Sequence, residues 1–365
     1  MLTYFIVFII SLFFYRFAVR KNNKNIVLPL VVVLLVLSTF AGVRDETVGT
    51  DMSVYVVRIW DMFLDVHTFQ EVITTSVLSE TEFGYSIFNY MISRITSDIH
   101  WFLFAHQLLI CLITLYIGYK ERDNIPTGYV LMFYLLGNYV TSFNLMRQSC
   151  AIACVLLAFY WAFYQDKKIL AFVAFLIGWS FHNSVILAIL LPISYNLFAK
   201  FQFNPKTMYI GGIVVTLLLY ISFRTFMGSL LNYGILSSKY EMYTDQSGYS
   251  SHKALLALYL YFFLLISYLR KFKYAEGIKS SFCQFASFIA VCLFLLGDQT
   301  EVANRIASYY TIPMFLLPSS VVANKQRQVY WYVLIPMLVV WVYLGVTTGL
   351  SDCVPYTSKI LGINP

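Results

Sequence analysis

The sequence predicts an all-α protein, a polytopic transmembrane helical bundle of about twelve spans with interfacial amphipathic helices on its outer face. The chain has 365 residues, of which 59% are hydrophobic and only 12% charged, about half the ~25% charge of a typical soluble domain. Its mean hydropathy is +0.71, and apolar runs recur roughly every 20 to 30 residues. Because one water-soluble core cannot hide this much apolar surface, the chain requires lipid as its solvent.

The apolar runs place the spans, since a helix needs roughly 20 predominantly apolar residues to cross the hydrocarbon core. We expect spans near residues 2–19, 26–42, 100–119, 126–142, 144–164, 168–181, 184–199, 207–223, 254–269, 281–298, 304–323 and 329–348. The first run lacks a basic n-region and a small-residue cleavage site, so it is expected to be a retained span. No internal repeat is apparent, and residues 1–365 are expected to form a single integral membrane domain.

Charged residues are distributed unevenly between the two sets of alternate loops. One set carries 16 of the 25 basic residues but only 4 of the 18 acidic ones. By the positive-inside rule this set is cytoplasmic and both termini lie outside. The net charge of +7 is therefore a topological signature, and no nucleic-acid partner is expected. The cytoplasmic loops are short and have no glycine-rich phosphate-binding loop, so function is expected at the outer face.

Two long outer segments, residues 43–99 and 224–253, hold most of the unusual polar residues and are expected to contribute to an active-site cleft. Residues 51–66 fit an amphipathic helix whose apolar face is formed by Tyr55, Ile59, Met62, Phe63 and Val66, with Arg58, Asp61 and Asp65 on another face. A second such helix begins after Ser79, with the apolar face Phe83, Ile87, Tyr90, Met91 and Ile95. This spacing predicts helices that lie in the membrane interface.

Three arginines are candidate ligands of a diphosphate, because planar guanidinium donors suit phosphate oxygens. Arg147 lies at the outer start of an apolar span, where a charged side chain is costly unless it functions or snorkels to the interface. Arg305 follows Glu301 by four residues, so an intrahelical ion pair is the alternative to a functional role. Arg44 follows the second span beside two acidic residues and, taken alone, is a solvated loop charge.

Three residues are candidate general bases, namely Asp51, Glu82 and His182. Ser79 and Glu82 have the spacing of a capping box, and Asp51 follows Thr50 where it can cap a helix, so capping explains both spacings. Either carboxylate can act as a base if it is held near a reacting hydroxyl. His182 lies in a tight outer turn between two spans, as either a hydrogen-bonded interface residue or a proton acceptor. The pattern does not rank the three.

No metal site or cofactor is expected. Five of the six cysteines lie in apolar stretches without ligand spacing, and the sequence has no HExxH and no paired carboxylates of the DxD type. Most of the aromatic residues belong to helix packing and interfacial belts. Tyr55, Tyr85, Tyr309 and Tyr310 neighbour the charged candidates, and aromatic faces there can stack on sugar rings.

Short motifs mark the ends of the spans between residues 41 and about 310. In chain order they are Ala41-Gly42-Val43-Arg44-Asp45, Val48-Gly49-Thr50-Asp51 with Tyr55, Glu82-Phe83-Gly84-Tyr85, Met146-Arg147-Gln148, His182-Asn183-Ser184, and Arg305 with Tyr309. In order and position they resemble the EpsG/Wzy family of bacterial polysaccharide polymerases, which act on O-antigen, exopolysaccharide and capsule repeat units.

The resemblance implies a membrane glycosyltransferase of the bacterial cytoplasmic (inner) membrane that works at its outer face. Its partners would be undecaprenyl-diphosphate-linked oligosaccharides, membrane lipid and a chain-length regulator protein. As a hypothesis, Arg147, Arg305 and Arg44 stabilise the departing diphosphate, and Asp51, Glu82 or His182 accepts the proton of the acceptor hydroxyl. The matching motifs also point to Tyr55, Tyr85, Gln148 and Tyr309 as substrate-binding residues.

Three other functions compete with this interpretation. A ligase similar to O-antigen ligases would use the same donor with a different acceptor. A transporter or flippase of lipid-linked sugars would need ionisable groups or broken helices near the midplane, whereas the candidates crowd the outer ends. A membrane acyltransferase would need a histidine near an acyl donor from inside, and His182 lies on the other side.

Overall fold

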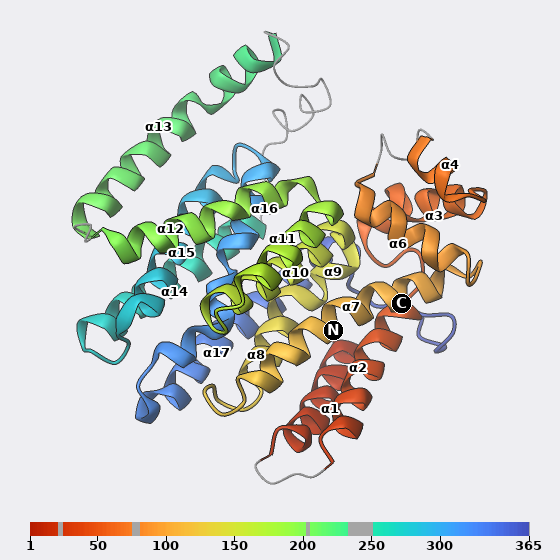
Figure 1. Ribbon diagram of the computed structural model, residues 1–365, viewed down its shortest axis with the longest axis horizontal. Helices are drawn as coiled ribbons and strands as arrows, with labels where there is room; N and C mark the ends of the chain where they lie inside the picture. The colour runs from red at the N-terminus through yellow and green to blue at the C-terminus, as the bar shows by residue number, and fades with distance from the viewer. Residues whose placement is uncertain (21–24, 75–80, 202–204, 233–250, 365) are drawn as a thin grey trace. The chain divides into compact units, whose positions relative to one another are not determined.

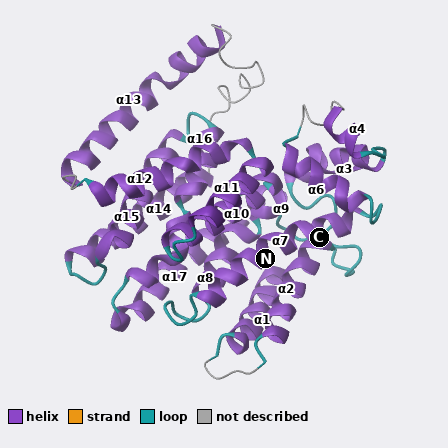
Figure 2. Cartoon of the chain, viewed as in Figure 1, coloured by secondary structure: helices purple, strands orange, loops and turns teal. Residues whose placement is uncertain are grey.

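The computed structural model describes the chain except for residues 21–24, 75–80, 202–204, 233–250 and 365 (Figure 1). The described residues form helices and loops, with no strand among them (Figure 2), which confirms the all-α prediction. They divide into two compact units: unit 1 comprises Met1–Ile186 and Tyr330–Pro365, and unit 2 comprises Leu187–Val329. The sequence offers no boundary between them, and a single integral domain stays a prediction.

Unit 1 is built on long apolar helices that pack side by side. In chain order they are α1 (Leu2–Ala18), α2 (Val27–Gly42), α7 (Ile99–Lys120), α10 (Met146–Phe163) and α11 (Lys168–Phe181). Helix α2 packs against α1 and α7, and α10 packs against α7 and α11. Shorter elements are α8 (Tyr129–Tyr134), a π-helical turn (Leu135–Tyr139), α9 (Thr141–Asn144) and α18 (Gly349–Asp352). Helix α17 (Ala323–Thr347) begins in unit 2 and continues through unit 1.

The segment between α2 and α7 carries four short elements. They are a π-helical turn (Met52–Val56), α3 (Val57–Leu64), α4 (Phe69–Thr74) and α6 (Phe83–Ser93). Both helices predicted here are therefore present, and their place in a membrane interface stays a prediction. The apolar face predicted for residues 51–66 packs into the protein, because Ile59, Phe63 and Val66 are buried while Arg58 and Asp61 are exposed.

Unit 2 is also helical. Its elements are α12 (Leu190–Lys200), α13 (Pro205–Asn232), α14 (Ser251–Lys271), α15 (Gly277–Leu296), α16 (Glu301–Tyr310) and a 3-10 helix (Ile312–Ser320). Helix α15 packs against α12, α13, α14, α16 and the 3-10 helix. A further 3-10 helix (Asn183–Ile189) leads into the unit from α11. Of the predicted outer segment 224–253, residues 233–250 lie outside the described residues.

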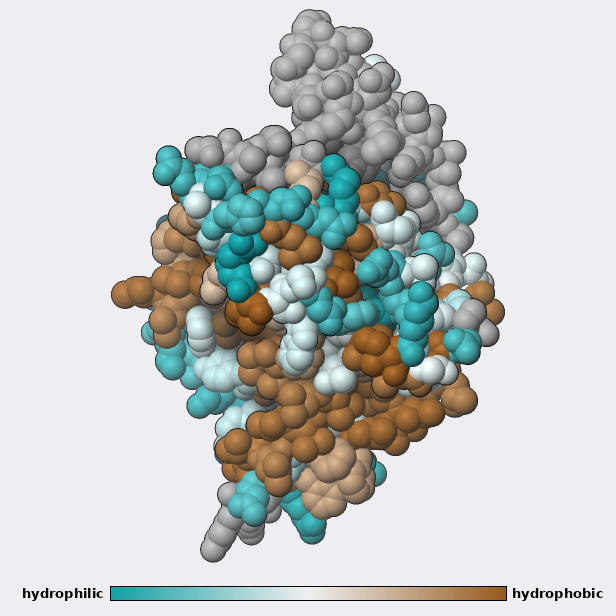
Figure 3. Space-filling model, turned by 90° about the vertical axis from the view of Figure 1, so that its right-hand side faces the viewer, coloured by the Kyte–Doolittle hydropathy of each residue, from teal (hydrophilic) through white to brown (hydrophobic). Residues whose placement is uncertain are grey.

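Five described helices are long and apolar enough to cross a membrane: Ile99–Lys120, Met146–Phe163, Lys253–Lys271, Gly277–Leu296 and Ala323–Thr347. Shorter apolar helices occupy five further predicted spans: Leu2–Ala18, Val27–Gly42, Lys168–Phe181, Asn183–Ser194 and Lys206–Ser222. On the side of unit 1 seen in Figure 3, hydrophobic side chains cover the lower part, at the height of α1 and α2, and polar ones gather above. The chain is a multi-pass membrane protein, and twelve spans stay a prediction.

Two predicted spans are interrupted rather than continuous. Residues 126–142 form α8, the π-helical turn and α9, so this stretch is not one regular helix. Residues 304–323 form α16 followed by the 3-10 helix, in which Pro313 and Pro318 lie. Proline has no backbone N–H to donate and its ring clashes with the preceding turn, which is why the α-helical pattern is not sustained there. Hydropathy alone does not report such breaks.

Arg44 is buried in the core of unit 1, with 1% of its surface exposed. Its Nη1 donates to the carbonyl of Ala41 at 2.6 Å and its Nη2 to that of Phe143 at 3.3 Å. The guanidinium also lies 4.6 Å from the centre of the Phe143 ring. The carbonyls at a helix end lack partners within the helix, so Arg44 holds the end of α2 against α9.

The C-terminal segment, residues 352–359, is hydrogen-bonded to the end of α2 and to the loop that follows it. The Tyr356 hydroxyl donates to the carbonyl of Phe40 at 2.6 Å. The Asp45 carboxylate accepts from the backbone N–H of Lys359 at 2.9 Å, and the Thr50 hydroxyl donates to the Asp352 carboxylate at 3.0 Å. Residues more than 300 positions apart in sequence thus fix the loop from which the π-helical turn begins.

We predict that Arg44→Ala destabilises the protein. The substitution leaves a cavity and removes the donors of two backbone carbonyls, a loss of roughly 2 to 4 kcal/mol. Thermal melting in detergent should show a melting temperature lower by several degrees. Arg58→Ala, which removes an exposed arginine on α3, is the matched control and should melt like the parent. Unchanged melting with lost activity would instead assign Arg44 to substrate binding.

Candidate active site

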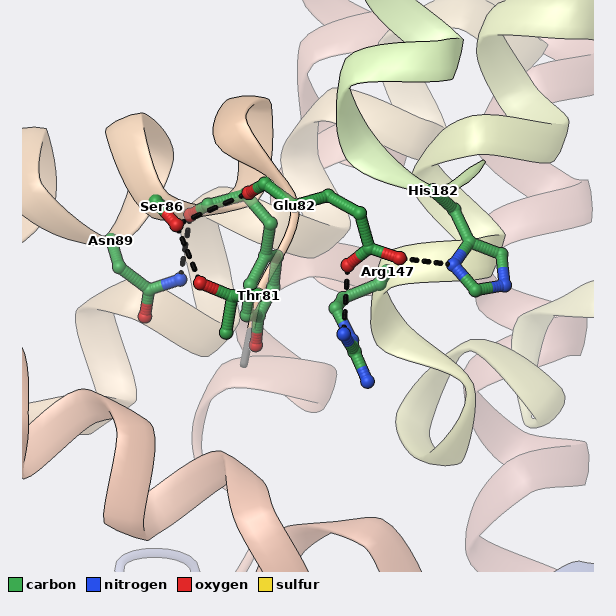
Figure 4. A network of polar contacts seen from close by, with 7 residues as sticks. Thr81, Glu82, Ser86, Asn89, Arg147 and His182 are labelled. Atoms are coloured by element: carbon green, nitrogen blue, oxygen red, sulfur yellow. Dashed lines mark hydrogen bonds and ion pairs between the residues drawn. The ribbon is translucent and has the colours of Figure 1, made fainter. Parts of the chain in front are cut away.

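Glu82 brings together three segments of unit 1 that are distant in the sequence. It lies just before α6, and its Oε2 accepts a hydrogen bond from Nη1 of Arg147 at 2.7 Å. Its Oε1 lies 2.7 Å from Nδ1 of His182. Arg147 stands in the first turn of α10, and His182 directly follows α11. One carboxylate therefore engages a cation with one oxygen and an imidazole with the other (Figure 4).

The three side chains are largely but not completely enclosed. Glu82 is 10% exposed, His182 17% and Arg147 23%. In Figure 4, the second ring nitrogen of His182 and the second terminal nitrogen of Arg147 point away from Glu82. Each of these groups thus has one nitrogen held by the carboxylate and another directed elsewhere.

The electrostatics of the site keep Glu82 ionised. Burial by itself would raise the pKa of Glu82, but the hydrogen bond with His182 and the positive charge of Arg147 outweigh it and lower the pKa from 4.5 to about 2. A carboxylate with so low a pKa is a poor proton acceptor near neutral pH. Of the two roles open to Glu82, orienting its neighbours fits this environment better than acting as the base.

The polar chain continues from Arg147 to Tyr55 and Asp51. The Arg147 guanidinium lies 4.9 Å from the centre of the Tyr55 ring, and the charges of Arg147 and Asp51 both act on the Tyr55 hydroxyl. Burial, and then the negative charge of Asp51, raise the pKa of Tyr55. The backbone N–H of Asp51 donates to the side chain of Asn144 at 2.7 Å. Five residues predicted from the sequence therefore lie in one line of neighbouring side chains: His182, Glu82, Arg147, Tyr55 and Asp51.

The other predicted residues are placed differently. Tyr85 and Gln148 adjoin the line but are buried, so neither presents an exposed surface to a sugar, although the Tyr85 ring lies 6.0 Å from the Arg147 guanidinium. Arg44 is closed into the core, and its Nη2 lies 3.8 Å from the sulfur of Met146. Arg305 and Tyr309 belong to α16 of unit 2, where Tyr309 is fully buried.

The capping interpretation of Glu82 and Asp51 is not what the structure shows. Helix α6 begins at Phe83, so Glu82 occupies the N-cap position instead of the third helical position of a capping box, and its side chain makes no capping hydrogen bond. The predicted partner Ser79 lies outside the described residues. Asp51 likewise makes no capping hydrogen bond with its side chain. The side chain of Glu82 is directed to Arg147 and His182.

Gly84 controls how closely α6 approaches α11, a role that the sequence analysis did not assign to it, although the residue is part of the motif Glu82-Phe83-Gly84-Tyr85. A Cβ atom at Gly84 would lie 2.2 Å from Oγ of Ser180 and 2.9 Å from its carbonyl carbon. Gly84 is two residues from Glu82, and Ser180 is two residues from His182. The close helix approach therefore sets the distance between the carboxylate and the imidazole. The sequence feature that could have pointed to this role is a glycine in the first turn of a predicted helix, where a helix former is otherwise expected.

Among the described residues, no group of three or more His, Cys, Asp or Glu side chains is placed to hold a metal ion. The side chains of the site are an arginine, which is suited to bind an anion, an imidazole, which is suited to move a proton, and a carboxylate that contacts both.

The fold and the site define a class, that of a multi-pass helical membrane protein in which a carboxylate, an arginine and an imidazole meet at helix ends. Residues 27–358 match the EpsG family, nearly the whole chain, and the protein belongs to that family. The resemblance seen in the motifs is thereby confirmed. The family suggests a polysaccharide-polymerase-type membrane protein, and its members are generally glycosyltransferase-like. No curated protein and no solved structure matches the chain.

We predict that Glu82→Gln lowers stability in a pH-dependent way. With a pKa lowered from 4.5 to about 2, the ionised Glu82 stabilises the folded protein by about 3 kcal/mol above pH 5, and this contribution is lost as the pH falls through about 2. Melting temperatures of the parent and the variant should therefore differ equally at pH 7 and pH 5, and by roughly half as much at pH 3.

The exposed Glu46→Gln is the control for this measurement and should melt like the parent at every pH. A difference that already shrinks between pH 7 and pH 5 would contradict the ion pairing of Glu82.

We predict that Gly84→Ala pushes α6 away from α11 and weakens the contact between Glu82 and His182. Overpacking of this kind costs roughly 1 to 3 kcal/mol. The melting temperature should fall. The remaining advantage of Glu82 over glutamine should be smaller than in the parent and should be completely lost at a higher pH, because a weaker contact raises the pKa of Glu82 in the folded protein toward its ordinary value. Adding Ser180→Gly to the variant removes two of the three clashing atoms and should restore part of the loss.

Gly211→Ala is the matched control, because nothing lies within 4 Å of the added Cβ. If the alanine at position 84 left both the melting temperature and its pH dependence unchanged, the spacing role of Gly84 would be wrong.

Proposed function

We propose that the protein is a polysaccharide polymerase that joins undecaprenyl-diphosphate-linked oligosaccharide repeat units. In this reaction the bond between the anomeric carbon of the donor glycan and its diphosphate breaks, and a bond to a hydroxyl oxygen of the next unit forms. The hydroxyl proton goes to a base, and undecaprenyl diphosphate departs as an anion. The observation that carries the proposal is the shared contact of Glu82 with Arg147 and His182.

His182 is the proposed base. Its Nδ1 lies against a carboxylate that stays ionised, so Nδ1 carries the proton of the neutral ring and Nε2 is the acceptor. The same division of roles operates in hydrolases in which a carboxylate orients an imidazole. Asp51 is the alternative base, at the far end of the line beyond Tyr55. Glu82 is the positioning residue.

Arg147 is the proposed diphosphate ligand. One terminal nitrogen is committed to Glu82, and the other points away from it (Figure 4). A cation fixed before the reaction stabilises the charge that grows on a departing diphosphate without reorganising. Arg305, on α16 of unit 2, stays a candidate ligand, whereas the buried environment of Arg44 supports a structural role. Tyr55, which contacts Arg147, is the proposed sugar-binding aromatic residue.

The same proposal includes the cellular setting. The charge bias of the loops supports a site at the outer face of the bacterial cytoplasmic membrane, where an already activated lipid-linked donor needs no nucleotide. The proposed partners are lipid-linked oligosaccharides, membrane lipid and a chain-length regulator. A ligase would use the same donor and the same residues with another acceptor, so the products separate the two functions.

The experiment is an assay of the purified protein in lipid nanodiscs, with its undecaprenyl-diphosphate repeat unit as the sole substrate and with the products resolved by size. We expect a ladder from the parent, and a rate lower by about 10²-fold or more for Arg147→Ala and for His182→Ala. Arg147→Lys should recover little, because lysine lacks the planar pair of donors.

Arg58→Ala is the control and should retain the parent rate. Losses below threefold for Arg147→Ala and His182→Ala at normal protein levels would refute the assigned roles. Binding of the repeat unit without a ladder, also after a partner or metal ions are added, would favour a ligase or a transporter.

A further inference from the structure

We propose that the outward face of α6 lies against the acyl chains of membrane lipid. Three apolar residues follow one another at intervals of four along this face, namely Phe83, Ile87 and Met91, and Ile95 follows at the same interval in the turn after the helix. Residues at this spacing form one continuous stripe on a helix. Phe83, Met91 and Ile95 are 48%, 60% and 80% exposed, so the stripe is turned out of the protein.

The opposite face of α6 is buried and carries the fully buried Tyr85 together with three polar residues. Ser86, Asn89 and Ser93 lie there, and none is exposed by more than 9%. Their side chains donate to carbonyls of the same helix: Ser86 to Glu82 at 3.1 Å, Asn89 to Tyr85 at 2.8 Å and Ser93 to Tyr90 at 2.9 Å. A helix that faces water buries its apolar residues and exposes its polar ones. Helix α6 instead exposes apolar residues and buries these three polar residues beside Tyr85, whose ring packs against Phe102. An exposed apolar face of this kind is expected where the surroundings are apolar.

The neighbouring helix α3 provides an internal comparison. It packs against α6, yet it buries Ile59 and Phe63 and exposes Arg58 and Asp61. Both helices belong to one short segment of unit 1 and differ only in which face is turned out. The simplest arrangement that accounts for both exposed faces places α3 toward water and α6 toward lipid. The boundary between water and lipid then runs between the two helices.

The connection to α7 supports lipid as the occupant. Helix α6 ends at Ser93, and α7, which is long and apolar enough to cross a membrane, begins at Ile99. Trp101, in the first turn of α7, is 58% exposed, and tryptophan is typical of the membrane interface. The charged Arg94 is turned away from the stripe, because its guanidinium donates to the carbonyls of Phe63 and Leu64.

This inference does not rest on the proposed polymerase activity, but it deepens it. Glu82 directly precedes α6, so a lipid-facing α6 places the cluster of Glu82, Arg147 and His182 at the edge of the lipid. A diphosphate attached to a lipid carrier then reaches Arg147 sideways from the membrane and does not have to leave the bilayer.

Spin labels on single introduced cysteines test the proposal on the full chain in lipid nanodiscs. Five of the six native cysteines are buried and Cys292 is partly buried, so labelling of the parent gives the background to subtract. Labels at Met91→Cys and Ile95→Cys are compared with Arg58→Cys and Asp61→Cys on α3 and with Leu112→Cys within α7. Relaxation by oxygen reports lipid, and relaxation by a water-soluble nickel chelate reports water.

We expect the labels at positions 91 and 95 to behave like the label at 112, with oxygen access at least several-fold above nickel access, and the labels at 58 and 61 to show the opposite. Nickel access at 91 and 95 equal to that at 58 and 61 would overturn the proposal, because α6 would then face water. Protection of 91 and 95 from both reagents would also overturn it, since protein would then cover the stripe. Neither result depends on catalytic activity.

Discussion

The site depends on the need to neutralise one buried carboxylate. Glu82 is largely withdrawn from water, and an isolated ionised carboxylate in such a place is costly. Arg147 and His182 each contact one of its oxygens at 2.7 Å, which keeps it ionised. Because the two partners lie on α10 and directly after α11, satisfying one charge also fixes how α6, α10 and α11 meet. The stability of the cluster and its chemical arrangement therefore have the same cause.

Much of the fold followed from the sequence, because hydropathy and helical periodicity are local properties. The chain positions of the apolar helices, the two helices between α2 and α7 and the candidates Glu82, Arg147 and His182 could all be predicted. The contacts among these three could not, because they join residues 65 and 100 positions apart. A capping box explained Glu82 equally well from spacing alone. The three-dimensional structure is needed to decide whether Glu82 caps a helix or contacts side chains that are distant in the sequence.

Arg44 shows the limit of another prediction. The residue types around it predict either a diphosphate ligand or, taken alone, a solvated loop charge. Arg44 is instead held by two backbone carbonyls and an aromatic ring. Helix ends supply unpartnered carbonyls, and a planar cation with several donors can join two such ends. The cost of burying the charge is thus offset by satisfying backbone groups. Sequence does not reveal this use, since the second helix end, at Phe143, lies 99 residues away.

Periodicity also leaves one question open that burial answers. An amphipathic helix has the same sequence pattern whether its apolar face packs on protein or on lipid. Residues 51–66 and the helix after Ser79 were therefore given the same interpretation. In the structure the first turns its apolar face inward and the second turns it outward. The inner face of α6 holds Tyr85 and three polar residues that bond to nearby backbone carbonyls, and its exposed face carries apolar residues. Glu82 stands immediately before this helix, so the orientation of α6 decides whether the cluster opens toward water or toward lipid. The proposed substrate, which is anchored in the membrane, would require the second.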